Sequence, residues 1–235
     1  MRTAVLTSGG KDSILALHRI IESKLVSKED LILVGVFPRN PESFMFHTVN
    51  LHVLEAIARC LGMPLFRAEV SGEEEREVLE LERALLDLEP EAICIGAIAS
   101  RYQLKRVEKI CRRHGFRLFA PLWGENPEKI LREVASKFEA IIVSVSAMGL
   151  DESFLGRKID QKCVEDLKII SGKYGVNLVG EGGEYESLVL DAPLFRKRIA
   201  IKRLEKLWHG SSGVAILREY EIEDKDISAG GELNP

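Results

Sequence analysis

A short polar turn between an apolar strand and an amphipathic helix constrains this chain more than any other segment. Residues 3–6 are apolar and partly β-branched, as in a buried parallel strand, and from Ser13 onward apolar side chains recur at helical spacing. The turn between them reads Ser8-Gly9-Gly10-Lys11-Asp12-Ser13. Its two glycines let the backbone approach an anion closely, and the helix start adds N–H groups and partial positive charge. The segment therefore predicts a phosphate-binding turn, in which Lys11 adds a full charge and the serines add hydroxyls.

Apolar runs that alternate with helical periodicity predict the rest of the fold. Before residue 121, strands are expected at residues 3–6, 31–37, 64–70, 92–95 and 117–120. Amphipathic helices are expected from residue 13 and at residues 47–60, 73–86 and 101–114. This alternation predicts an α/β fold with a doubly wound, parallel, five-stranded sheet that helices cover on both faces.

Residues 121–127 combine prolines with glycine and asparagine, and they mark an expected boundary. Beyond it the pattern predicts a second, smaller α/β domain that ends in a β-hairpin. Its expected elements are helix 128–138, strand 140–145, helix 160–174, strand 176–179 and a long hairpin that begins near residue 197. The predicted domains are 1–124, which would bind a nucleotide, and 125–223, which would bind a substrate, followed by a flexible tail at 224–235.

Composition narrows the class of protein. Apolar residues make up 46% and charged residues 30%, as in ordinary globular proteins, and no apolar run is long enough to span a membrane. The first residues enter a strand at once, so we expect no signal peptide and a cytoplasmic location. A net charge of −4 gives no general attraction for nucleic acid. The basic residues at 101–113 form either a local patch or a solvated helix face, and the oligomeric state stays open, a homo-oligomer included.

The cysteines show no spacing typical of a metal site. Cys60, Cys94, Cys111 and Cys163 include no C-x-x-C pair, which argues against a zinc site, a redox pair or a disulfide framework. Each is expected to pack in the core.

The turn at residues 8–13 fits neither a Walker loop nor a dinucleotide fingerprint. As it stands, S-G-G-K-D-S resembles the PP-loop of the N-type ATP pyrophosphatases, which cleave ATP between its α and β phosphates. Further segments, in order along residues 1–222, resemble one branch of that superfamily, the ATP-dependent diphthine-ammonia ligases. These segments lie at residues 43–47, 96–108, 120–124, 149–157, 180–186 and 191–193.

The resemblance implies an adenine nucleotide alpha hydrolase-like fold and an AMP-forming ligase that uses ATP and Mg²⁺. Ammonia would amidate diphthine on translation elongation factor 2 through an acyl-adenylate, giving diphthamide, AMP and pyrophosphate. The nucleotide would contact residues 8–13 together with Phe37, Phe46, His47 and Gly96. Lys11 and Asp12 would take part in catalysis. Asp12 either binds the magnesium ion or caps the helix, and the sequence leaves both open.

Acidic residues in glycine-rich turns of the second region are candidates for the acceptor site. Such acids would bind the trimethylammonium group of diphthine, bind ammonium or deprotonate it, with Glu184 or Glu186 as the base. The full candidate set for the acceptor is Tyr102, Gln103, Asp151, Glu152, Arg157, Glu181, Glu184 and Glu186. The alternative is that these acids cap helices and form surface ion pairs, while Tyr102 and Gln103 brace their helix.

Two other functions use the same phosphate turn. A tRNA-modifying PP-loop enzyme would adenylate a base, but this chain lacks a catalytic cysteine pair and has an acidic balance. A non-catalytic protein that binds ATP or AMP is the other alternative, since one fold supports many functions. Pyrophosphate release that depends on an added acceptor distinguishes an enzyme from a binding protein.

Overall fold

The structure is a computed structural model that describes residues 1–40 and 49–225. Its first half is a parallel sheet with the strand order β3-β2-β1-β4-β5. The strands are β1 (Thr3–Leu6), β2 (Leu31–Pro38), β3 (Leu65–Val70), β4 (Ala92–Cys94) and β5 (Arg117–Phe119). The predicted five-stranded parallel sheet is confirmed. The central strands are apolar along their length because helices bury them on both faces.

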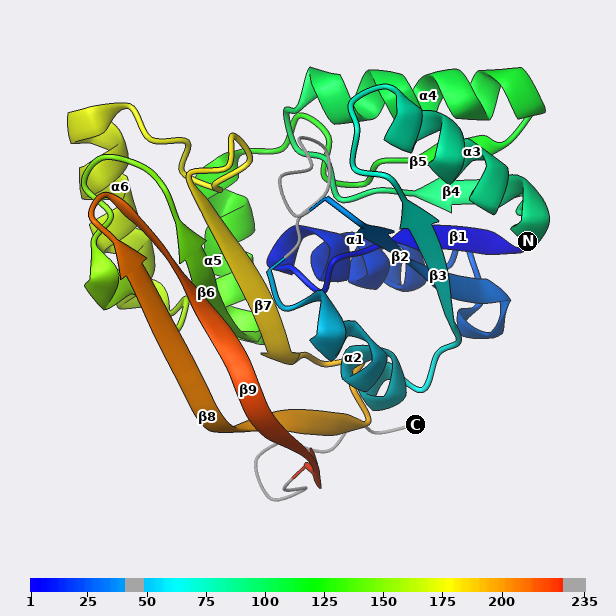
Figure 1. The fold of residues 1–235 in the computed structure, drawn as a ribbon. Helices are drawn as coiled ribbons and strands as arrows, with labels where there is room; N and C mark the ends of the chain where they lie inside the picture. The colour runs from blue at the N-terminus through cyan, green and yellow to red at the C-terminus, as the bar shows by residue number, and fades with distance from the viewer. Residues whose placement is uncertain (41–48, 226–235) are drawn as a thin grey trace.

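Helices cover the two faces of this sheet (Figure 1). One face carries α1 (Lys11–Glu22) and α2 (Leu54–Leu61), and the other carries α3 (Arg76–Leu88) and α4 (Arg101–His114). The side chain of Ser100 accepts a hydrogen bond from the backbone of Gln103 and so caps the start of α4. The doubly wound arrangement expected from the sequence is therefore present.

The second half is a four-stranded sheet with the order β7-β6-β9-β8, in which the pairings are antiparallel. Its strands are β6 (Glu139–Val145), β7 (Tyr185–Asp191), β8 (Lys197–His209) and β9 (Ser212–Asp224). Helices α5 (Pro127–Lys137) and α6 (Gln161–Tyr174) pack beside it, and β7 runs along the side nearest α1 (Figure 1). The predicted hairpin is formed by β8 and β9, and its turn lies at Gly210 and Ser211.

The two sheets share one hydrophobic core. The larger core cluster contains residues from β1, α1 and α2 together with residues from β6, β7 and β9. Buried polar side chains connect the same elements. Asn50 donates to the carbonyl of Ala215 and accepts from the amide of Leu217, both at 2.8 Å. His18 accepts a hydrogen bond from the amide of Leu194, and burial lowers its pKa, which keeps the ring neutral. The shared core and these buried hydrogen bonds therefore hold β7 in its position against α1.

Three expected elements differ from the structure. The expected strand at residues 176–179 is wrong: these residues lie in a turn, where the side chain of Asn177 accepts the amide of Val179. The strand of this region is β7, which the sequence did not predict. The helix expected at 47–60 is a 3-10 turn, η2 (Leu51–Val53), followed by α2, and the helix expected at 73–86 begins at Arg76. The tail expected at 224–235 lies almost wholly outside the described residues.

Other expectations concern burial. All four cysteines are free and buried, which confirms their predicted place in the core. Burial raises the pKa of Cys94 to about 12, so its thiol stays protonated and unreactive. Within residues 1–40 and 49–225, no helix has the length and apolar character that crossing a membrane requires.

Candidate nucleotide and acceptor site

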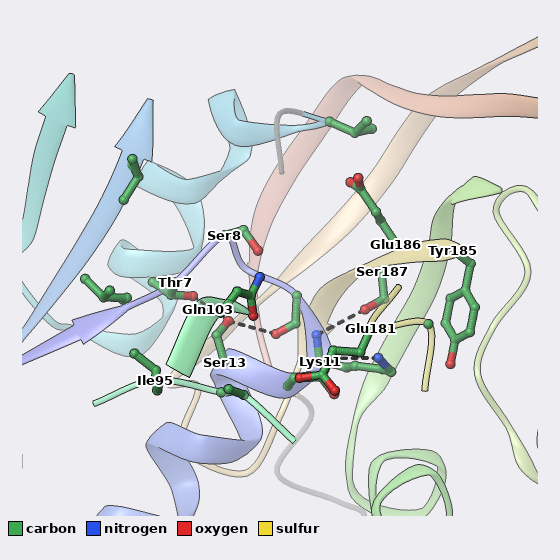
Figure 2. Close-up of a pocket in the computed structure, with 18 of the residues that line it drawn as sticks. Thr7, Ser8, Lys11, Ser13, Ile95, Gln103, Glu181, Tyr185, Glu186 and Ser187 are labelled. Atoms are coloured by element: carbon green, nitrogen blue, oxygen red, sulfur yellow. Dashed lines mark hydrogen bonds and ion pairs between the residues drawn. The ribbon is translucent and has the colours of Figure 1, made fainter. Parts of the chain in front are cut away.

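A pocket opens at the carboxyl ends of β1, β2 and β4, where the second sheet meets the first; we call it the central pocket. The strand order reverses between β1 and β4, which is the switch point where ligands bind in open α/β sheets. Both halves of the chain line the pocket, as Figure 2 shows. Its lining residues are Leu6, Thr7, Ser8, Gly10, Lys11, Asp12, Ser13, Val36, Val49, Ile95, Gly96, Ala97, Gln103, Val107, Gly180, Glu181, Tyr185, Glu186 and Ser187.

The PP-loop, residues 8–13, turns sharply into α1. Gly9 has a φ of +80°, and a β-carbon there would lie 2.5 Å from Cδ1 of Ile57. The backbone conformation therefore requires glycine, and a side chain here would also displace the end of Ile57. Gly10 is the N-cap of α1, so no side chain of its own caps the first turn. The loop thus presents backbone groups and the start of a helix to the pocket, as the sequence predicted.

A chain of hydrogen bonds holds the PP-loop in shape. The amide of Gly9 donates to Oγ1 of Thr7 at 3.0 Å, and Oγ1 of Thr7 lies 2.8 Å from Oγ of Ser13. The hydroxyl of Ser13 donates to the carbonyl of Gly10 at 3.0 Å. The Thr7 hydroxyl must then donate to Ser13, since the Ser13 hydrogen is already used. Thr7 and Ser13 therefore brace the loop, and Thr7 is a site residue that the sequence analysis missed.

Lys11 is buried, with 3% of its side chain exposed, although it lies in a polar turn. Its ammonium donates to Oδ2 of Asp12 at 2.8 Å and to the carbonyl of Val179, and it lies 5.1 Å from the centre of the Tyr185 ring. The second region thus covers this side chain. Asp12 does not cap α1, because Gly10 is the N-cap, and its carboxylate is the ionic partner of Lys11.

Strand β7 contacts the PP-loop directly. The amide of Lys11 donates to Oγ of Ser187 at 3.1 Å, and the amide of Val189 donates to the carbonyl of Gly9 at 2.9 Å. Ser187 is a second site residue that the sequence did not indicate. Its role depends on β7 lying beside α1, and no local pattern records that contact. The second region therefore forms a wall of the phosphate-binding turn.

Residues 180–186, which we call the second acidic loop, form part of that wall. Both carboxylate oxygens of Glu181 accept backbone amides of the segment after β4, from Ile98 at 2.8 Å and Ala99 at 2.7 Å. Glu186 lines the central pocket, and its side chain points away from Lys11 in Figure 2. Glu184 does not line the pocket; its Oε1 accepts the amide of Asn177 at 3.1 Å and holds the loop together.

Residues 149–157, the first acidic loop, lie elsewhere, and none of their side chains lines the central pocket. Oδ1 of Asp151 accepts hydrogen bonds from the hydroxyl and the amide of Ser153, which lower the pKa of Asp151. Arg157 pairs with Asp166 of α6, and Glu152 begins the short helix η3 (Glu152–Phe154). Of the two acidic loops that the sequence predicted to form one acceptor site, the structure therefore brings only the second to the central pocket.

Of the other predicted nucleotide contacts, Gly96 lines the central pocket and Phe37 does not. Gly96 lines the pocket, and a β-carbon there would lie 2.7 Å from the amide nitrogen of Ser13, so glycine is required where α1 packs on the segment after β4. Phe37 does not line the pocket, and its ring stacks under the guanidinium of Arg67. Phe46 and His47 lie outside the described residues.

The two candidate residues of α4 have different surroundings. Gln103 lines the central pocket. The hydroxyl of Tyr102 donates to Glu74 at 3.1 Å, and the guanidinium of Arg106 lies 3.4 Å from the centre of the Tyr102 ring. Tyr102 therefore connects α4 to the segment before α3.

The side chains that line the pocket indicate whether it can hold a metal ion. In the part of the chain that the structure describes, no three His, Cys, Asp or Glu side chains gather as a metal cluster. Mg²⁺ seldom needs such a cluster, because it keeps several waters and binds one or two carboxylates together with substrate phosphates. The carboxylates of Asp12 and Glu186 line the pocket, so the residues fit a magnesium ion that a nucleotide brings with it.

The glycine-rich turn, the parallel sheet and the pocket at its switch point define a nucleotide-binding α/β protein of the PP-loop type. Family models place it more narrowly. The model described as "Diphthamide synthase N-terminal domain" matches residues 1–118, and that described as "Diphthamide synthase C-terminal domain" matches residues 126–222. The chain belongs to the diphthamide synthase family.

Individual relatives agree with this assignment. A human protein named diphthine--ammonia ligase is 36% identical over 255 residues, covering 96% of this chain and 94% of that protein. The Bos taurus protein of the same name is 35% identical with the same coverage. The Schizosaccharomyces pombe protein is 34% identical and covers 100% of this chain but 42% of its own length. The resemblance to diphthine-ammonia ligases is therefore confirmed.

One solved structure is similar at a lower level. It is described as a predicted subunit of tRNA methyltransferase from Methanocaldococcus jannaschii. It is 19% identical, covers 82% of this chain and 98% of its own, and has a TM-score of 0.44, which is too low to bear on fold or function.

Proposed function

We propose that this protein is an AMP-forming ligase that amidates diphthine on translation elongation factor 2 with ammonia. The observation that carries the proposal is the central pocket, where the PP-loop and the carboxylate of Glu186 face one space. Membership of the diphthamide synthase family supports the choice of substrate, as does the name of its relatives, diphthine--ammonia ligase. The division into a nucleotide domain at 1–124 and an acceptor domain at 125–223 is part of the proposal.

The nucleotide binds with its phosphates on the PP-loop. Residues 8–13 supply the helix start, the hydroxyl of Ser8 and, behind them, the ammonium of Lys11. The base lies against the apolar wall formed by Leu6, Val36 and Ile95, whose strands end at the pocket. Gly96 allows the close packing that shapes this side. Phe46 and His47, which lie outside the described residues, stay proposed neighbours of the adenine or the ribose, whereas Phe37 does not.

The first chemical step forms the acyl-adenylate. A carboxylate oxygen of diphthine attacks the α-phosphorus, and the bond to the β-phosphate breaks to release pyrophosphate. The PP-loop and Lys11 stabilise the negative charge that develops on the β and γ phosphates, because their dipoles and charge are already oriented. Asp12 is the proposed ligand of Mg²⁺, which when bound would neutralise part of the phosphate charge.

The second step forms the amide. Ammonia attacks the acyl carbon, AMP leaves, and the nitrogen gives up a proton. Glu186 is the proposed base because it lines the pocket, whereas Glu184 does not. Glu181 and Gln103 complete the acceptor side. We propose that the acids of this wall also attract the trimethylammonium group of diphthine.

The protein acceptor and the ammonia follow from the same proposal. The acceptor is elongation factor 2 that carries diphthine, and the reaction takes place in the cytoplasm.

One reaction tests the proposal. The protein is incubated with magnesium ATP, ammonium and diphthine-bearing elongation factor 2, and the nucleotide and protein products are identified by mass. The expected products are AMP, pyrophosphate and an acceptor in which an amide replaces a carboxylate. Omitting the acceptor is the control, and pyrophosphate release should then fall to background. ADP and phosphate as the main products would contradict the proposal, and so would turnover with tRNA in place of the protein acceptor.

A further inference from the structure

We propose that Ser187, which lies on β7 in the second region, binds a phosphate of the nucleoside triphosphate. Its hydroxyl hydrogen is donated to a phosphate oxygen, while its oxygen holds the first amide of α1. This inference rests on the proposed function, because it requires the phosphates to lie on the PP-loop. It adds a residue from outside the glycine-rich turn to the phosphate-binding set.

The first observation is the capping of α1. A helix begins with amides that have no partner within the helix, and an N-cap side chain ordinarily satisfies one of them. Gly10 has no side chain to do this. Oγ of Ser187 accepts the amide of Lys11 at 3.1 Å and so caps α1 from another strand. Ser187 is thereby held at the helix end, where an anion is most favoured.

The second observation concerns which hydroxyl groups of the central pocket already donate their hydrogen within the protein. Thr7 and Ser13 use their hydrogens within the PP-loop, as described above, and Tyr185 donates its own to the carbonyl of Leu178 at 2.9 Å. The oxygen of Ser187 accepts from Lys11, and no acceptor for its hydrogen lies among residues 1–40 and 49–225. Ser8 and Ser187 therefore each keep a hydroxyl hydrogen that they can donate to a ligand. Ser8 belongs to the PP-loop, whereas Ser187 lies on β7.

The third observation is that Ser187 is rigidly placed. It pairs with Ile142 in the register of β6 and β7, and Val189 is bonded to the carbonyl of Gly9. A β-carbon on Gly10 would lie 3.2 Å from the carbonyl oxygen of Ser187, so the glycine is what lets β7 approach this closely. A donor on a rigid strand loses little freedom when it binds a ligand.

Calorimetric titration with two probes tests the inference. Magnesium ATP and adenosine are titrated into the wild-type protein and into Ser187→Ala, Ser187→Thr and Ser144→Ala. Ser187→Ala should weaken ATP binding by about tenfold or more, because a hydrogen bond to a charged phosphate is lost. Adenosine binding should not change, since adenosine has no phosphate. Ser187→Thr keeps the hydroxyl and should restore most of the ATP affinity.

Ser144→Ala is the matched control. Ser144 lies on β6 opposite Glu186 in the same sheet and does not line the pocket, so its removal should leave both affinities unchanged. If Ser187→Ala does not fold, Ser187→Cys keeps the shape with a weaker donor and should show a partial loss. ATP affinity equal to wild type, or an equal loss for ATP and adenosine, would overturn the inference alone. A wild-type protein that binds no ATP would overturn the proposed function and the inference together.

Discussion

The two acidic loops share a content of glycine and acidic residues but have different surroundings. The first acidic loop keeps its charges within its own neighbourhood: Asp151 bonds to Ser153, and Arg157 pairs with Asp166. The second acidic loop reaches across to the nucleotide side, where Glu181 bonds to Ile98 and Ala99. Both loops are rich in glycine and acidic residues, so composition alone does not distinguish them. What separates them is which strand each loop lies beside, and that is decided by the packing of β7 against α1.

The same kind of substitution should therefore have different consequences in the two acidic loops. Charge changes in the second acidic loop and its contacts should alter ATP binding or catalysis, because these groups touch the central pocket or the segments that line it. Charge changes in the first acidic loop should alter stability by small amounts and leave ATP binding unchanged.

Lys11→Met should have the largest effect. It removes the charge behind the proposed phosphate site and keeps a side chain of similar length. Pyrophosphate release should fall on the order of 10³-fold, since an oriented charge that stabilises the leaving group is lost. The free energy of unfolding should also fall by about 1–3 kcal/mol, because the partners Asp12 and Val179 lose a buried charged donor.

Both effects of Lys11→Met are measured on one preparation, by a pyrophosphate assay and by urea denaturation. Lys158→Met is the control, because Lys158 is exposed and follows the first acidic loop directly. It should leave turnover and stability unchanged. Wild-type turnover in Lys11→Met, or an equal loss in both variants, would contradict the assignment of Lys11.

Glu186→Gln should come next. Loss of the carboxylate should lower amide formation by on the order of 10²-fold, if it accepts the proton from ammonia, and should leave ATP affinity within a few fold. Glu152→Gln makes the same change in the first acidic loop and should keep full ligase activity. The measurement is the rate of amide formation on the protein acceptor, followed by mass. If Glu152→Gln loses ligase activity and Glu186→Gln does not, the first acidic loop contributes to the reaction and the second does not.

The sequence predicted the nucleotide side well because its signals are local. A strand, two glycines and a helix start are consecutive at residues 3–22, and regular alternation predicted the parallel sheet. The contacts of Lys11 and Ser187 were not predictable in this way. The contact of Ser187 with the amide of Lys11 depends on β7, a strand that the sequence did not predict, and the burial of Lys11 depends on the second region, whereas Thr7 bonds locally to Gly9 and Ser13.

The acceptor side shows the same limit. Turn signals placed Asp151, Glu181 and Glu184 in loops correctly, but the prediction was wrong for Glu186, which lies in β7. Composition alone also did not tell a carboxylate that bonds its own loop, such as Asp151, from one that bonds a distant segment, such as Glu181. The expected strand at 176–179 failed because side chains bond the backbone locally there, through Asn177 and Glu184, and favour a turn over a short apolar strand.

Glu181→Gln should weaken ATP binding by about tenfold, because the amide group keeps one acceptor oxygen and places N–H groups against a backbone N–H. The segment that Glu181 holds, residues 98–99, directly follows residues 95–97, which line the pocket. Calorimetric titration with magnesium ATP measures the effect, and Glu152→Gln serves again as the matched change in the first acidic loop. Unchanged ATP affinity in Glu181→Gln would show that this contact does not shape the pocket.

Asp151→Ala should have the smallest effect, and its dependence on pH identifies the cause. The side chain caps η3 through Ser153, and these hydrogen bonds hold the pKa of Asp151 below its ordinary value of 3.8. A carboxylate with a lowered folded pKa stabilises the protein above its unfolded pKa, and this stability is lost as the pH falls through the folded pKa. At pH 7 the variant should lose about 0.5 kcal/mol of unfolding free energy, a value discounted because the group is exposed. The difference from wild type should shrink as the pH is lowered below 3.8 in urea denaturation, while ATP affinity at pH 7 stays unchanged. A loss of ATP affinity would place the first acidic loop at the pocket after all.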